Sequence, residues 1–118
     1  MSSFSQERYQ QAVDALDGGD ESAKTTIAFY KLTGYGGVTI DAEEAVALLR
    51  ERVDDGDAQA MLLLGLCTEH GIGTEKDVEL AKGLYSFSAE AGVPVAVLLL
   101  TNEKKGTDSF VINNWSLL

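Results

Sequence analysis

The most reactive residue types in this chain are a cysteine and a histidine three positions apart, Cys67 and His70. On a helix this spacing puts both side chains on one face, as a nucleophilic dyad or half a zinc site would require. Each is the only residue of its type in the sequence. A closed zinc site needs four ligands, and a thiol nucleophile needs an orienting third group. We therefore interpret Cys67 as a packing residue and His70 as a helix-end residue, and a Cys67/His70 enzyme remains a third hypothesis.

Glycine-rich and aspartate-rich segments also invite a chemical interpretation. Residues 34–37 and 71–73 contain closely spaced glycines, but neither segment is followed by the Gly-Lys-Ser/Thr of a phosphate-binding loop. Residues 54–57 are rich in aspartate but lack the ligand register of a calcium loop. We interpret all three as turns next to helix ends. The sequence thus predicts no catalytic residue, no metal site and no cofactor.

Length and charge limit the remaining classes of protein. The 118 residues are enough for a single domain. Nineteen acidic residues against nine basic ones give a net charge of −10, which disfavours binding to nucleic acid or to an anionic membrane. No apolar run approaches the roughly 20 residues of a membrane span, and the first residues do not resemble a signal peptide. We therefore expect a cytoplasmic protein.

A repeat organises the chain. The segment that begins at Asp20 recurs 37 positions later at Asp57, and each unit contains two stretches with the 3.6-residue apolar spacing of helices. This predicts antiparallel helix pairs at 20–33 with 42–55 and at 57–70 with 77–91, after an N-terminal helix at 4–17. Aspartates are expected to cap these helices, and glycines to end them. The predicted caps are Asp20, Asp41 and Asp57, and the predicted helix-ending glycines include Gly34 and Gly71.

The residues of the second unit carry a family resemblance. Its small and apolar positions are Ala58, Ala60, Leu64, Gly65, Gly71, Gly73, Ala81, Tyr85, Ala89 and Gly92. This pattern resembles the Sel1-like repeat, a relative of the tetratricopeptide repeat, over residues 20–106. The resemblance implies an all-α superhelix with repeats at 20–56 and 57–92, a partial repeat at 93–106 and a tail at 107–118. The first unit is degenerate, since Ala28 replaces the glycine found at Gly65.

The resemblance also implies a function, because members of this family mostly act as adaptors that assemble protein complexes. In superhelices of this type the first helix of each pair lines a concave groove. The predicted groove residues, which would contact a protein or peptide partner, are Phe29, Gln59, Leu62, Leu66, Glu69, Leu98 and Asn102. If the helices are rotated from this frame, the same apolar residues are core.

Two further hypotheses concern the charge and the tail. The acidic residues allow a second class of protein, a small inhibitor or immunity-type protein that blocks a basic partner.

The tail is strongly apolar, and we expect it to dock through Phe110, Ile112, Trp115 and Leu117. It could dock in cis against the third helix and the groove, or in trans to form a homodimer.

Overall fold

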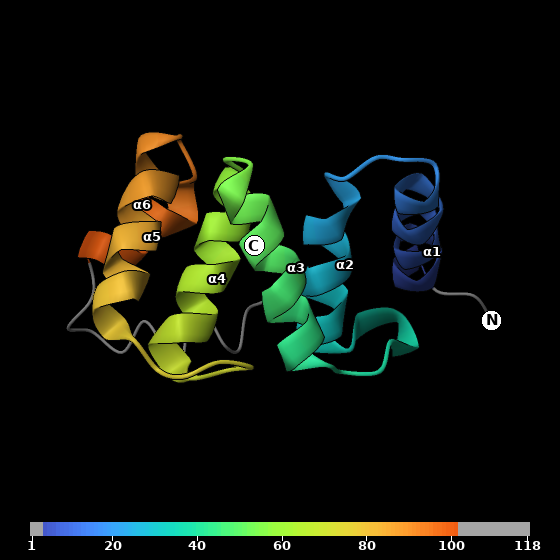
Figure 1. Cartoon of the computed structure of the whole chain (residues 1–118), viewed down its shortest axis with the longest axis horizontal. Helices are drawn as coiled ribbons and strands as arrows, with labels where there is room; N and C mark the ends of the chain where they lie inside the picture. Colours follow the sequence, from blue (N-terminus) through green and yellow to red (C-terminus); the bar gives the residue numbers. More distant parts are fainter. Residues whose placement is uncertain (1–3, 102–118) are drawn as a thin grey trace.

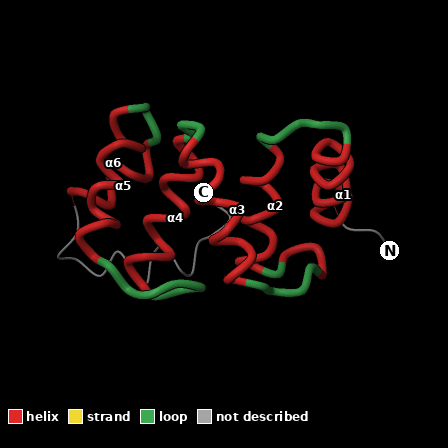
Figure 2. Tube along the Cα trace, in the orientation of Figure 1, coloured by secondary structure: helices red, strands yellow, loops and turns green. Residues whose placement is uncertain are grey.

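The computed structural model describes residues 4–101, which form a single row of helices (Figure 1). In chain order the elements are α1 (Phe4–Asp17), α2 (Ala23–Thr33), the 3-10 turn η1 (Tyr35–Gly37), α3 (Ala42–Asp54), α4 (Ala58–His70), α5 (Val78–Glu90) and α6 (Pro94–Thr101). Loops join successive helices alternately along the two long edges of the row, and no strand occurs within residues 4–101 (Figure 2). The predicted all-α superhelix is therefore confirmed.

The helix boundaries follow from the capping residues. Asp41 accepts a hydrogen bond from the backbone N–H of Glu44 (3.1 Å), and Asp57 accepts two, from the backbone N–H groups of Gln59 (3.0 Å) and Ala60 (3.1 Å). The prediction that Asp20 caps α2 is wrong. Its carboxylate accepts from the N–H and the hydroxyl of Ser22, so the chain makes a turn there and the helix begins only at Ala23.

Helix α4 lies in the middle of the core and is buried along its central turns. All seven residues from 62 to 68 are buried, as is Ala60. Its closest contact is with α5, because the ring of Tyr85 lies against the backbone of Gly65, where no side chain intervenes. Gly65 is therefore a packing position, as the repeat pattern predicts, and this contact fixes the rotation of α4.

Helix α1 packs on the first repeat as α3 packs on the second. Gly36 and Gly73 occupy equivalent positions, 37 residues apart. A Cβ at Gly36 would lie 2.9 Å from the backbone nitrogen of Gln6 in α1. A Cβ at Gly73 would collide with the backbone of Ala42 in α3. Because both turns approach the start of a preceding helix, α1 takes the place of the second helix of an earlier pair.

Candidate functional site

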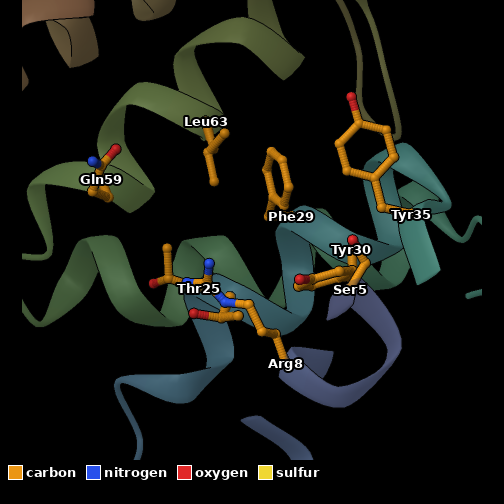
Figure 3. A pocket seen from close by; sticks show the side chains of 9 residues that line it. Ser5, Arg8, Thr25, Phe29, Tyr30, Tyr35, Gln59 and Leu63 are labelled. Atoms are coloured by element: carbon orange, nitrogen blue, oxygen red, sulfur yellow. The ribbon is translucent and has the colours of Figure 1, made fainter. Parts of the chain in front are cut away.

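A pocket of about 580 Å³ opens between α1, α2, η1 and α4 (Figure 3). Its lining consists of Ser5, Arg8, Thr25, Thr26, Phe29, Tyr30, Tyr35, Gln59 and Leu63. Two consecutive first helices, α2 and α4, contribute six of the residues that form its walls, and we call this side of the molecule the first-helix face. The pocket includes Phe29 and Gln59, two of the seven residues predicted for the groove.

Aromatic side chains form one wall of the pocket. The ring of Phe29 meets the rings of Tyr30 and Tyr35 edge to face, with centroid distances of 5.8 and 5.7 Å. Tyr30 in turn meets Tyr9 of α1 at 5.6 Å. Such contacts hold aromatic rings in fixed orientations. Because Tyr35 remains 38% exposed, the wall offers a rigid apolar surface to a ligand.

The pocket has few polar groups, and some of them already form hydrogen bonds within the protein. The hydroxyl of Thr25 donates a 2.7 Å hydrogen bond to Oδ2 of Asp57, which also lies 3.5 Å from Nε of Arg52. Burial alone would raise the pKa of Asp57, but the hydrogen bonds from Thr25, Ala60 and Arg52 outweigh it, and the pKa is lowered. The exposed amide of Gln59 and the guanidinium of Arg8, which lies 5.5 Å above the ring of Phe4, remain at the rim.

The structure brings two predicted groove residues together, Phe29 and Gln59. Glu69 lies elsewhere and has a structural partner, because its Oε1 accepts a 2.7 Å hydrogen bond from the hydroxyl of Tyr85. Leu98 is half exposed on α6 and does not line the pocket. Asn102 and the tail residues Phe110, Ile112, Trp115 and Leu117 lie outside the described residues.

Two predicted groove residues are inaccessible. Leu62 and Leu66 are 0% and 1% exposed, so the prediction that they line an open groove is wrong. The sequence could not show this, because α4 is apolar around most of its circumference and such a helix has no distinct exposed face. A partner cannot touch these two side chains while they are buried in this way.

Sequence reasoning missed most of the lining, including Arg8, Tyr35 and Leu63. Arg8 comes from the N-terminal helix and Tyr35 from the turn after α2, so neither belongs to the first-helix pattern that predicts the groove. A signal for Tyr35 existed, since an aromatic residue between glycines is an unusual choice for a plain turn.

The candidate dyad lacks an accessible thiol. Cys67 is fully buried, and burial raises the pKa of its thiol to about 12, so the thiolate nucleophile does not form at neutral pH. Nε2 of His70 lies 3.8 Å from a carboxylate oxygen of its neighbour Glu69. Within residues 4–101 no three histidine, cysteine or carboxylate side chains come together as a metal site would require.

Comparison with known proteins identifies the family. The Sel1 repeat model matches residues 27–51 and 58–93, which is more than half of the chain, so the chain belongs to the Sel1 repeat family. Proteins of this family generally serve as protein-interaction modules. Among the helices of residues 4–101, none has the length and apolar character needed to cross a bilayer.

A solved structure supports the assignment. The crystal structure of a Sel1 repeat protein from Oxalobacter formigenes is 29% identical to this chain and superposes with a TM-score of 0.71. The match covers 80% of this chain but 37% of that protein, so the chain spans little more than a third of the length of its structural relative. No curated protein matches the chain.

Proposed function

We propose that this chain is a non-catalytic protein-interaction module that binds a peptide segment of a partner protein in the pocket between α1, α2, η1 and α4. The observation that carries the proposal is the composition of the pocket. A rigid aromatic wall with an accessible Tyr35 lies beside a few neutral polar groups. This is the usual make-up of a site that recognises a peptide through a large apolar side chain.

The same lining argues against chemistry in the pocket. Its described residues include no cysteine, histidine or carboxylate, and Arg8 is their one charged side chain. General acid–base and nucleophilic catalysis both need such groups within hydrogen-bond reach of the substrate. Binding without reaction is therefore the activity that these residues support best.

Peptide selection tests the proposal without knowledge of the partner. Peptides selected from a random display library against the intact protein would be labelled, and their affinities measured by fluorescence anisotropy. Tyr35→Ala and Gln59→Ala should each weaken binding about tenfold, because truncation of an interface anchor typically costs about 1–2 kcal/mol. Raising the ionic strength should change the affinity little, since apolar contacts are not screened by salt.

A matched control separates the pocket from the rest of the surface. Phe87 is 62% exposed on α5 and does not line the pocket, so Phe87→Ala should leave the affinity unchanged. Selected peptides that bind the Tyr35 and Gln59 variants as tightly as the unaltered protein would disprove the pocket as the site. Affinity that falls steeply with salt would favour an acidic surface instead.

A further inference from the structure

We infer that the chain's own segment Phe110–Leu117 docks in cis along the first-helix face, with Trp115 at the aromatic pocket. The docking is independent of the proposed function. Its consequence, that a partner peptide competes with the protein's own tail, rests on that function.

The first observation is an inequality of burial between equivalent repeat positions. Leu62 and Leu66 correspond to Thr25 and Phe29 in the preceding repeat. Each pair sits on a first helix that is followed by another first helix, α6 after α4 and α4 after α2. Thr25 and Phe29 are nevertheless only partly buried, whereas Leu62 and Leu66 are 0% and 1% exposed. The apolar surface that stays accessible on the first-helix face therefore lies at Phe29 and the aromatic pocket rather than at Leu62 and Leu66.

The second observation is the chemistry of the segment. Residues 109–118 include no charged side chain, although the whole chain has a net charge of −10. Six of the nine residues from 110 to 118 are large and apolar: Phe110, Val111, Ile112, Trp115, Leu117 and Leu118. An uncharged apolar segment meets no repulsion from the acidic surface. Contact with apolar side chains removes its own apolar groups from water.

The third observation is reach. Helix α6 ends at Thr101, and an extended chain advances about 3.3 Å per residue. Ile112 can therefore lie about 36 Å from the end of α6, and Trp115 about 46 Å. The longest dimension of the molecule is 41 Å, so the pocket is within range of Trp115. Because the segment is tethered, its local concentration at the face is in the millimolar range for a short flexible linker, and weak contacts suffice.

The sole tryptophan and the sole cysteine make a direct test practical. Gln59 lines the pocket and is exposed, so Gln59→Cys can carry a nitroxide label, which quenches tryptophan only at short range. Ser86 is exposed on α5, outside the pocket lining, and Ser86→Cys provides the matched control. Buried Cys67 should not take the label in the folded protein.

The label at position 59 should cause a loss of Trp115 emission that the label at position 86 does not cause. In both proteins the emission should shift to the blue relative to the unfolded chain. Equal quenching from both labels, or emission at the wavelength of a solvated indole, would overturn the docking.

A mixing experiment distinguishes cis from trans. Labelled Gln59→Cys protein that also carries Trp115→Phe is mixed with unlabelled protein that retains Trp115. In cis docking the emission of the unlabelled protein is unchanged. Quenching in the mixture would show that the segment docks on a second copy, and would overturn the inference.

The regulatory consequence has its own readout. Deletion of residues 109–118 should increase the affinity for peptides selected as described above, with circular dichroism used to check the fold. A protein whose tail docks but that binds no peptide would refute the proposed function and leave the docking intact. Peptide affinity unchanged by the deletion would refute the competition.

Discussion

The ring of Tyr85 lies so close to Gly65 that a Cβ at position 65 would come within 2.5 Å of Cε1 and 2.8 Å of Cδ1. The ring has little freedom to move away. Tyr85 is 3% exposed, and its hydroxyl is held by a 2.7 Å hydrogen bond to Glu69. Residue 65 therefore fixes the spacing of α4 and α5, and the narrow space admits only glycine without rearrangement.

The first prediction concerns this contact. Gly65→Leu should lower the free energy of unfolding by about 1–3 kcal/mol through overpacking, as measured by urea denaturation. Gly83→Ala is the matched control, because a Cβ built at Gly83 in α5 has no neighbour within 4 Å. It should stabilise the protein by up to about 1 kcal/mol through better helix propensity. Equal effects at both positions would contradict the observed helix spacing.

The second prediction compares two leucines at equivalent positions of successive first helices. Leu62→Ala should cost about 2–5 kcal/mol of unfolding free energy, because the side chain is completely buried and its removal leaves a cavity. Leu98 is 50% exposed, so Leu98→Ala should cost roughly 1 kcal/mol or less. Thermal or chemical denaturation of both variants provides the comparison. Similar losses would mean that the open end of the helix row is covered as well as its centre.

The third prediction concerns acid stability. The pKa of Asp57 in the folded protein is lowered from its ordinary value of 3.8. Its ionised form therefore adds stability that is fully present above pH 3.8 and is lost as the pH falls through the lowered value. The unaltered protein should be more stable than Asp57→Asn at neutral pH. The difference should shrink in acid, as urea titrations at successive pH values would show.

Thr25→Val serves as the control for this mechanism. The variant removes the 2.7 Å hydrogen bond to Asp57 while it leaves the carboxylate and both backbone caps in place. Without that bond the pKa of Asp57 should move up toward its ordinary value, so the acid-dependent loss should be smaller and should be complete at a higher pH. An unchanged pH profile in Thr25→Val would show that Asp57 is governed by other groups.

The fourth prediction concerns the thiol. Cys67 is fully buried and burial raises its pKa to about 12, so a thiol reagent at neutral pH should modify it only after unfolding. The native protein should show almost no reaction, and the denatured protein one reactive thiol. Rapid modification of the native protein would contradict the buried position and reopen a chemical role for Cys67.

The sequence alone predicted the helices well, because their boundaries depend on local chemistry. Asp41 and Asp57 cap the helices that were assigned to them. Gly34 and Gly71 end theirs with φ values of 74° and 70°, a backbone conformation that glycine adopts without strain. The error at Asp20 is also local, since a capping aspartate and a turn-forming aspartate look alike in a sequence.

The candidate site was predicted only in part, because it depends on contacts between distant segments. Phe29 and Gln59 follow from the repeat pattern, whereas Arg8 and Tyr35 reach the pocket from outside it. The exposure of Leu62 could not be inferred from residue types, since an apolar side chain fits a groove and a core equally well. Only the three-dimensional packing distinguishes the two.

The equivalence of Gly36 and Gly73 shows how arrays of this kind can grow. Each turn accepts the start of a preceding helix by the same backbone approach, and it makes no difference whether that helix is α1 or α3. The contact between a turn and the preceding helix is therefore the same for successive units. A duplicated unit of 37 residues, introduced in phase between the two repeats, could pack on both flanking repeats through the same contact. In this protein a genetic duplication of one unit would lengthen the first-helix face without the need for a new kind of helix contact.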